Sequence, residues 1–503
     1  MIVLTNSQMK EAEQKAMTDF NISSLILMEN AALNVVNYIE ENFNKKTKIA
    51  AVCGKGNNGG DGFAIARGLF SRGFQVSVFA CGDMERATPD CKTNYEIVKS
   101  LGITFSDNLK EAVSKADITI DAVIGTGLTK TLRADTAEIV SCINAYSHYT
   151  IAVDCPTGIN SDNGEVLGSA VKADLTYTFH APKKGLLFYP AREYVGGLKV
   201  GSIGTPVLES ENPPYINTLT DEEAAEMLPK RLSSSNKGTY GRVIAFSGCD
   251  EMTGAAVLNL KAAYKSGAGL ACGIATEKCV DVIHTSLTEA VTKIAPNEKG
   301  FLTPEALEKA KPLLNEKAVI TAGSGLGVTL STKALIKALV NTIETTLIID
   351  ADGINCLADM REELKNSKAN VILTPHIKEM SRLCGKTIKD IKAEPVGIAL
   401  SFAEEYGVTV MLKDTVTVIA SPKGKVTVNN AGTAAMSKGG TGDVLAGLTA
   451  GLSAQGLSPH NAAALAAYIN GKAGELGEEE KGSYGLTASD LCGYIPKVME
   501  KLK

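Results

Sequence analysis

A glycine-rich turn that carries an aspartate is the strongest chemical signal in the sequence. Residues 436–447 read MSKGGTGDVLAG, and the apolar stretch after the turn favours a helix. Glycines let the backbone approach a ligand closely, and the free N–H groups at a helix N-terminus bind anions. Asp443 falls in the first helical turn, where its carboxylate could serve as general base for a hydroxyl that attacks a phosphate. Capping the helix is an equally common role for such an aspartate.

Three further motifs in the same half of the chain follow predicted strands. Residues 323–327 read GSGLG, residues 349–355 read IDADGIN with Asp350 and Asp352, and residues 374–379 read TPHIKE. Ligands of open α/β sheets bind outside the carboxyl ends of the strands, so these motifs are expected to face one site. His376 taken alone would more often be a loop or core histidine, but its neighbours favour a contact with substrate.

The first half carries a second group of glycine-rich turns. Residues 52–63 read VCGKGNNGGDGF directly after a predicted strand, a pattern that is neither GxGxxG nor a Walker loop, and we expect a backbone nest there. Two further strand ends read DAVIGTGLTKT (121–131) and VDCPTG (153–158), which places Asp121 and Asp154 at neighbouring strand ends. Two carboxylates so placed suit a cation site and a general acid–base group; the capping of turns is the alternative.

Both halves alternate short β-branched runs with longer helical stretches, which predicts two α/β domains with doubly wound, mainly parallel sheets. A connector with Pro206, Pro213 and Pro214 is expected over residues 205–222. The last three runs predict a hairpin or an antiparallel edge in the second domain. The predicted strands cover residues 48–52, 75–80, 118–122 and 150–153 in the first half, and 241–247, 318–322, 346–349, 370–373, 408–412, 417–419 and 425–428 in the second.

Composition excludes several classes of function. The 503 residues suggest two or three domains, the net charge is −5, and tryptophan is absent, so binding to nucleic acid or to anionic membranes is not expected. No apolar run approaches the roughly 20 residues of a membrane helix, and no signal peptide is recognised. The 11 cysteines form no CxxC pair, which indicates reduced thiols. We expect a cytoplasmic homo-oligomer that binds neither nucleic acid nor membranes.

Taken together, the motifs of the second half resemble the ADP/ATP-dependent NAD(P)H-hydrate dehydratase family, a branch of the ribokinase-like fold, over residues 219–503. The resemblance implies that Asp443 is the catalytic base and that Ala255, Gly325 and His376 contact the hydrated nicotinamide nucleotide. The nucleotide loop of this family usually reads KGxxT, whereas residues 413–417 read KDTVT, which leaves the backbone at Asp414 open. The nucleotide contacts implied are Lys413, Asp414, Thr415, Val416, Thr417, Gly440, Thr441 and Gly442.

The chemistry that this resemblance implies is phosphorylation followed by elimination. ADP would give AMP while its terminal phosphoryl group passes to the ring hydroxyl of hydrated NADH or NADPH (NADHX or NADPHX), and Asp443 would take the hydroxyl proton. Loss of phosphate then restores the dihydronicotinamide. A magnesium ion would bridge the phosphates, because this cation needs few protein ligands when phosphates are present.

The first half, over residues 1–212, resembles the NAD(P)H-hydrate epimerase domain, which implies a Rossmann-like three-layer fold. By this resemblance Asp154 is the acid–base residue, and Asn58, Asp121 and Thr157 bind a potassium ion. Lys183, in FHAPKKG, is either a partner of Asp154 or an ordinary surface lysine. The substrate contacts implied are Asn57, Asn58, Gly59, Gly60, Asp61, Gly125, Thr126, Gly127, Leu128, Thr129, Lys130 and Thr131. An epimerase fused to a dehydratase specific for the S epimer would allow repair of both epimers.

Two other functions remain open at this point. A GTGD loop alone also fits a small-molecule kinase of the ribokinase type, acting on a vitamin or a sugar. The first half could instead be a binding or scaffold module without catalytic activity. The complete NNGGDG string together with Asp121 and Asp154 favours an enzyme.

Overall fold

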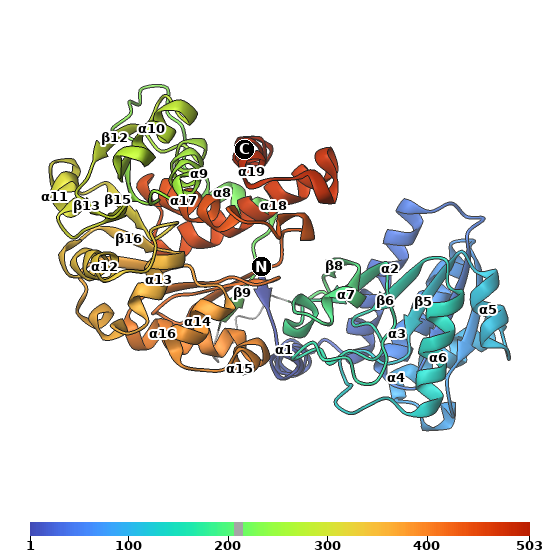
Figure 1. Ribbon diagram of the computed structural model, residues 1–503. Coiled ribbons are helices and arrows are strands. Elements are labelled where there is room, and N and C mark those ends of the chain that lie inside the picture. The colour runs from blue at the N-terminus through green and yellow to red at the C-terminus, as the bar shows by residue number, and fades with distance from the viewer. Residues whose placement is uncertain (206–214) are drawn as a thin grey trace. The chain divides into compact units, whose positions relative to one another are not determined.

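The computed structural model describes residues 1–205 and 215–503. The chain forms two compact units that divide within the undescribed interval (Figure 1). Most of the predicted connector, residues 206–214, therefore lies outside the described residues. Its last part forms strand β9 (Tyr215–Asn217) and the first residues of helix α8 (Asp221–Met227).

The N-terminal unit is built on a parallel sheet in the order β4-β3-β2-β5-β6-β7-β8. The four strands predicted from the sequence are confirmed, whereas β4, β7 and β8 were not predicted. The strands are β2 (Lys48–Cys53), β3 (Gln75–Ala80), β4 (Thr104–Phe105), β5 (Ile118–Ala122), β6 (Thr150–Val153), β7 (Leu175–Phe179) and β8 (Gly197–Gly201).

Helices cover both faces of this sheet, which gives the predicted three layers. Alternate residues of β2 show the arrangement, because successive side chains of a strand point to opposite faces. Ile49 and Cys53 pack in one apolar cluster with helices α1 to α4, whereas Val52 packs in another with Val113 and Val140 of α5 and α6. The helices are α1 (Asn6–Asp19), α2 (Ser24–Asn42), α3 (Asn57–Ser71), α4 (Pro89–Ser100), α5 (Leu109–Lys115), α6 (Ala134–Tyr146) and α7 (Arg192–Val195).

The C-terminal unit is built on a larger sheet, in which the order β9-β20-β19-β18-β17-β16-β15-β10-β11-β12 can be followed. Its strands are parallel except for the pairs β18–β19 and β19–β20, which confirms the predicted hairpin. The predicted strands are confirmed to within one or two residues, and β9, β11 and β12 were not predicted. The strands are β10 (Arg242–Phe246), β11 (Leu270–Ala275), β12 (Val291–Ile294), β15 (Ala318–Ala322), β16 (Thr346–Ile349), β17 (Asn370–Leu373), β18 (Thr409–Leu412), β19 (Thr417–Ala420) and β20 (Lys425–Asn429); β13 (Asn297–Glu298) and β14 (Phe301–Leu302) form a separate hairpin.

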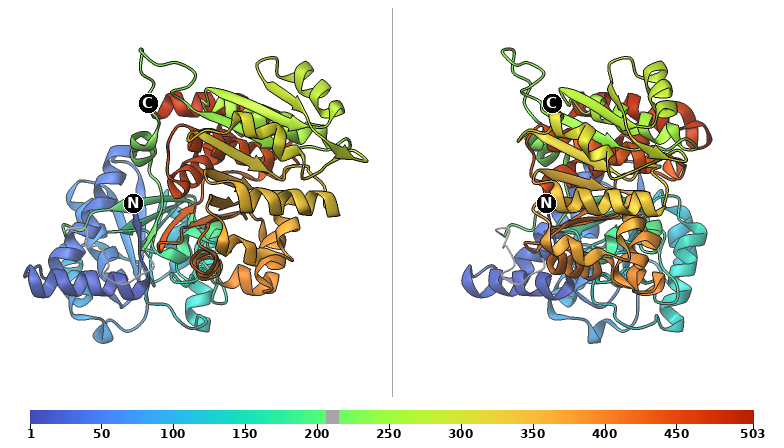
Figure 2. Two further views of the ribbon diagram at one scale, coloured as in Figure 1. Left: turned by 90° about the vertical axis from the view of Figure 1, so that its left-hand side faces the viewer. Right: turned by 60° about the vertical axis from the view of Figure 1, so that its left-hand side comes forward.

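The helices near the C-terminus pack on one side of this sheet (Figure 2). Helix α17 packs very closely against α9. A Cβ atom at Gly447 would lie only 2.0 Å from the carbonyl oxygen of Asn259. Only glycine allows this approach. The remaining helices are α9 (Thr253–Lys265), α10 (Glu277–Ser286), α11 (Ala306–Ala310), α12 (Leu330–Thr342), α13 (Ala351–Leu357), α14 (Ile377–Cys384), α15 (Ile388–Ala393), α16 (Pro395–Tyr406), α17 (Thr441–Ala454), α18 (Pro459–Gly485) and α19 (Ala488–Leu502).

Over the described parts of the chain, none of the helices combines the length and the apolar character that crossing a membrane requires.

Candidate active sites

The glycine-rich turn of residues 438–442, called the phosphate turn below, leads directly into helix α17. Gly440 is the N-cap residue and has a left-handed backbone, with φ 92°, which glycine adopts without strain. Asp443 lies in the first turn of the helix. Within the described residues its carboxylate accepts no hydrogen bond from the helix backbone, so the capping role is wrong for this aspartate. The N–H groups at this helix end stay available for an anion.

Burial raises the pKa of Asp443 from its usual 3.8 to about 6, and the charge of Asp350 contributes to the rise. The hydroxyl of Ser324 and the charge of Lys413 act in the opposite direction. A carboxyl with a pKa near the operating pH is suited to take and release protons, which is what a general base requires.

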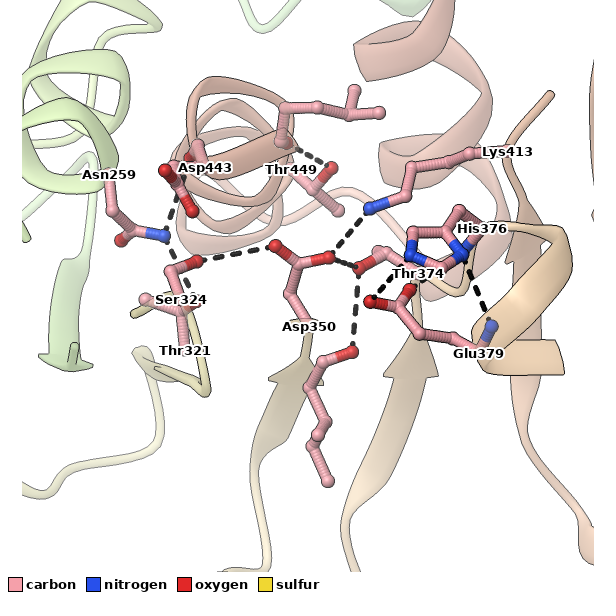
Figure 3. A network of polar contacts seen from close by, with 12 residues as sticks. Asn259, Thr321, Ser324, Asp350, Thr374, His376, Glu379, Lys413, Asp443 and Thr449 are labelled. Atoms are coloured by element: carbon pink, nitrogen blue, oxygen red, sulfur yellow. Dashed lines mark hydrogen bonds and ion pairs between the residues drawn. The ribbon is translucent and has the colours of Figure 1, made fainter. Parts of the chain in front are cut away.

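Asp350 is the centre of a polar network that joins the ends of four strands (Figure 3). Its carboxylate is only 1% exposed and accepts hydrogen bonds from Lys413 Nζ at 2.7 Å, Thr374 Oγ1 at 2.6 Å and Ser324 Oγ at 3.3 Å. Asp350 follows β16, and the three donors follow β18, β17 and β15, respectively. The structure therefore brings the predicted motifs to one site at the carboxyl ends of parallel strands, as the topology requires.

Lys413 is the cation of this network. Burial alone lowers its pKa, but the charges of Asp350 and Glu379 outweigh burial and raise the pKa above its usual value. Glu379 is itself 5% exposed, and burial raises its pKa. Lys413 thus remains charged at neutral pH, close to Gly442, where a Cβ atom would lie 3.4 Å from Lys413 Nζ.

The predicted nucleotide loop after β18 accommodates its aspartate without a special backbone conformation. Asp414 is not among the described residues with positive φ, so the position does not need the conformational freedom of glycine. Asp414 and Thr415 are exposed, Val416 is buried and Thr417 begins β19. The departure from KGxxT therefore leaves the backbone of this loop intact.

His376 begins helix α14 as its N-cap residue. Its Nδ1 accepts hydrogen bonds from the N–H groups of Lys378 and Glu379, and the Glu379 carboxylate accepts one from the backbone N–H of His376. The side chain is about half exposed, at 49%. His376 has a structural role at the helix end, and its contact with substrate stays a prediction.

Ala255 and Gly325, both predicted to contact substrate, lie side by side. Gly325 has φ 61°, and a Cβ atom there would lie 2.7 Å from Cβ of Ala255. Asn259, one turn further along α9, was missed by the sequence analysis. It is fully buried, and its Nδ2 donates to the carbonyl oxygen of Asp443 at 3.5 Å and to Thr321 Oγ1 at 3.4 Å. No motif marks a single asparagine inside a helix.

The N-terminal unit contains a cavity of about 600 Å³ at the ends of its strands. The structure places many of the predicted residues on its wall and keeps others away. The residues Leu128, Thr129, Lys130 and Thr131, and the glycines Gly59 and Gly60, do not line the cavity. Those that do are Asn57, Asn58, Asp61, Gly125, Thr126, Gly127, Asp154 and Lys183.

Asp154 and Lys183 form an ion pair in this cavity, with 2.5 Å between Oδ1 and Nζ. Lys183 is 1% exposed and also donates to Thr178 Oγ1 and to the carbonyl oxygen of Phe179. The alternative of a surface lysine is therefore wrong. Asp154 has φ 64°, a left-handed conformation that costs free energy for a residue other than glycine and that is often found at functional sites.

The string NNGGDG forms the first turns of helix α3, where the sequence analysis expected a backbone nest. Its glycines permit close packing: a Cβ atom at Gly59 would lie 1.8 Å from the carbonyl oxygen of Gly54, and one at Gly60 would lie 2.6 Å from Cε of Met28. Asp61 follows them and faces the cavity. Burial raises its pKa well above the usual value, with Asp154 and Glu13 adding to the effect.

Asp121 is a fully buried carboxyl whose neighbours are neutral. It accepts hydrogen bonds from the Thr157 N–H at 2.9 Å and from Thr157 Oγ1 at 2.7 Å, so it also holds this turn, as the alternative interpretation expected. Burial raises its pKa to about 6, against these hydrogen bonds. The amide of Asn58 bridges the carbonyl of Val153 and the N–H of Gly125. Oxygen atoms around a carboxylate without an ion-pair partner in the described residues suit a small cation.

Comparison with known proteins found family matches for both units. A family model described as NAD(P)H-hydrate dehydratase matches residues 243–497, and one described as YjeF-related protein N-terminus matches residues 24–185. The bifunctional NAD(P)H-hydrate repair enzyme of Moorella thermoacetica is 36% identical over 516 residues, which cover 100% of this chain and 97% of the relative. The enzyme of the same description from Thermofilum pendens is 34% identical over 513 residues, with the same coverage of 100% and 97%.

A solved structure resembles the C-terminal unit. The ADP/ATP-dependent NAD(P)H-hydrate dehydratase of Bacillus subtilis, crystallised with ATP and Mg²⁺, is 29% identical, with a TM-score of 0.51. The match covers 58% of this chain and 100% of that one.

Proposed function

Because the chain belongs to the family of bifunctional NAD(P)H-hydrate repair enzymes, we propose that it restores hydrated NADH and NADPH in two reactions. An epimerase domain, residues 1–212, interconverts the R and S hydrates. A dehydratase domain, residues 219–503, converts the S hydrate to the dihydronicotinamide and ADP to AMP and phosphate. The observation that carries the proposal is that Asp443, with its raised pKa, lies at a helix N-terminus close to Lys413, which is paired with the buried Asp350.

In the dehydratase, each group of the network has one task. Asp443 accepts the proton of the ring hydroxyl as this oxygen attacks the terminal phosphorus of ADP. The N–H groups of Gly440, Thr441 and Gly442 and the charge of Lys413 stabilise the negative charge on the transferred group. Asp350 holds Lys413 in place. Phosphate then leaves far more readily than hydroxide would, and the ring double bond is restored.

The carboxylates of the site fit a magnesium ion that is held mainly by the nucleotide. Mg²⁺ usually binds one or two carboxylates together with substrate phosphates. Two carboxylates lie at the phosphate turn: Asp443 Oδ2 would be 4.0 Å from a Cβ atom at Gly440, and Asp350 Oδ2 would be 3.9 Å from a Cβ atom at Gly442. When bound, the ion neutralises phosphate charge.

In the epimerase, Asp154 and Lys183 act on the substrate in the cavity described above. The ion pair keeps Asp154 available as a proton acceptor beside the ring. Asn58, Asp121 and Thr157 would hold a potassium ion, which would neutralise the buried Asp121 and fix the turn after β6. Asn57, Asp61 and Gly125 to Gly127 would contact the substrate.

The deciding experiment incubates the purified protein with ADP and hydrated NADH and follows the absorbance of reduced nicotinamide, with ATP in a parallel sample. Recovery of absorbance is expected from the S hydrate, and recovery from the R hydrate requires the epimerase. Asp443→Asn abolishes both, whereas Asp154→Asn abolishes only recovery from R. Accumulation of a stable phosphorylated product without recovery would favour a small-molecule kinase. Failure to recover absorbance with either nucleotide would overturn the proposal.

We also propose that the enzyme acts in the cytoplasm as a homo-oligomer. The eleven cysteines are unpaired in the structure, which fits a reducing compartment. Light scattering on the purified protein measures the oligomeric state, and a mass equal to a single chain would contradict this part of the proposal.

A further inference from the structure

The cavity of the N-terminal unit contains a carboxyl group that the proposed function does not use. Glu13 lies on helix α1, one residue after the buried Ala12 and four after the buried Met9, so it is on the side of the helix that packs against the unit. It lines the same cavity as Asp154 and Lys183. Within the described residues, the Glu13 carboxyl has no hydrogen-bond or ion-pair partner, although it is largely buried.

The chemistry of epimerisation requires two groups that transfer protons. Water adds to the enamine of a dihydropyridine so that the hydroxyl ends on the carbon bonded to the ring nitrogen. Inversion at this carbon proceeds when the hydroxyl leaves from one face, the nitrogen lone pair forms a C=N⁺ bond, and water returns to the other face. Hydroxide is a poor leaving group, so its departure needs an acid, and the returning water needs a base. Asp154, as an anion, supplies only the base.

We propose that Glu13 is the general acid of the epimerase and acts together with Asp154. In the R-to-S direction the Glu13 carboxyl gives its proton to the hydroxyl as the C–O bond breaks and water departs. Water then forms a new C–O bond on the other face, and Asp154 takes its proton. Exchange with solvent returns a proton to Glu13 and removes one from Asp154; the reverse reaction exchanges the two roles. This inference rests on the proposed function.

The charges around Glu13 favour it over Asp61 as the acid. Burial and the carboxyls of Asp154, Glu13 and Asp90 keep Asp61 protonated, and the charge of Lys183 opposes them without outweighing them, so Asp61 is poorly suited to release a proton. Glu13 faces Asp154 but also two cations, Lys183 from the segment after β7 and Lys10 from its own helix. These cations stabilise the anion that forms when Glu13 has given up its proton.

The same surroundings predict how the rate depends on pH. Burial raises the pKa of Glu13 above 4.5, and the charge of Asp154 raises it further. An acid must be protonated to act, so epimerisation is expected to slow as pH rises through this pKa.

The test measures conversion of the pure R hydrate of NADH to the S hydrate by chromatography, with the full-length protein and without ADP. Glu13→Gln is expected to lower kcat by about 10²–10⁴-fold, to leave KM nearly unchanged and to remove the alkaline limb of the pH profile. Glu11→Gln is the matched control, because Glu11 lies on the same helix, is not on the cavity wall and forms an ion pair with Lys15, and it should behave as wild type. ADP-dependent dehydration of the S hydrate should be unchanged in both variants.

Two further measurements separate the inference from a structural effect and from failure of the proposed function. In H₂¹⁸O the wild type should incorporate one solvent oxygen per inversion; inversion without incorporation would show that the hydroxyl never leaves and would overturn the inference. Glu13→Asp should recover part of the activity, and equal loss in Glu13→Asp and Glu13→Gln would also overturn it. Absence of epimerisation in the wild type would instead contradict the proposed function, whereas a Glu13→Gln variant with normal rate and pH profile contradicts only the role of Glu13.

Discussion

Replacing Asp443 with asparagine removes the carboxyl that we assign as the dehydratase base and, at the same time, removes a charge that the fold holds unfavourably. The pKa of Asp443 rises from 3.8 to about 6 because the carboxyl is buried and lies near Asp350. A raised pKa means that the folded protein binds this proton more tightly than the unfolded chain does. The ionised carboxylate therefore destabilises the fold at neutral pH.

The size of this effect follows from the two pKa values. The difference corresponds to about 3 kcal/mol at pH values above about 6, at about 1.4 kcal/mol for each tenfold change in proton affinity. About half of this penalty is present near pH 5, and none remains below about pH 3. The asparagine side chain of the variant would be a buried amide and keep some desolvation cost, so we expect Asp443→Asn to stabilise the unit by about 2 kcal/mol near pH 8. The same change should lower kcat of dehydration by about 10²–10⁴-fold.

Hydrogen exchange measured by mass spectrometry on peptides of α9 and α17 reports the stability of this unit separately from the other. Asp281→Asn on α10 is the matched control, because Asp281 is exposed and the change in net charge is the same. The gain in Asp443→Asn should exceed that of the control near pH 8 and shrink near pH 5. An equal or pH-independent gain would refute the argument from burial and like charge, and undiminished dehydration would refute the role of Asp443 as base.

Three other results are expected. Lys183→Met leaves Asp154 without its partner and should cost the N-terminal unit about 3–5 kcal/mol in hydrogen-exchange stability and abolish R-to-S conversion while S-hydrate repair continues; unchanged epimerisation would contradict the pairing. Gly447→Ala should separate α17 from α9 and reduce both the dehydration rate and the melting temperature. Gly493→Ala should be neutral or slightly stabilising, because its Cβ position has no atom within 4 Å apart from its own helix backbone. Equal effects of the two changes would contradict the close packing of α17 on α9. Replacing potassium with lithium should lower epimerase activity and the melting temperature of wild type but leave Asp121→Asn unaffected, and equal sensitivity would argue against the cation site.

Local sequence was sufficient to predict the strands that helices cover on both faces of the sheet. Strands such as β5 and β15 are buried over their whole length and consist mainly of apolar and β-branched residues, since helices cover them on both sides, and these strands were predicted to within a residue. Strand β8 alternates exposed with half-buried residues and contains two glycines, and β4 has only two residues, so neither carries such a run. The turn at Gly440 was recognised because glycine, an anion-binding helix end and an acid must be adjacent in sequence to work together.

The sequence by itself determined the two α/β domains, the phosphate turn with Asp443, and the polar residues at the strand ends, because each of these depends on neighbours within a few positions. Only the tertiary structure decided which of these residues meet. Lys183 is buried against Asp154, 29 positions away, and Lys413 pairs with the buried Asp350, 63 positions away. It also decided that Glu13 faces a cavity and that Asp443 carries a raised pKa. Burial and the field of distant charges are properties of the packed fold, and no local pattern records them.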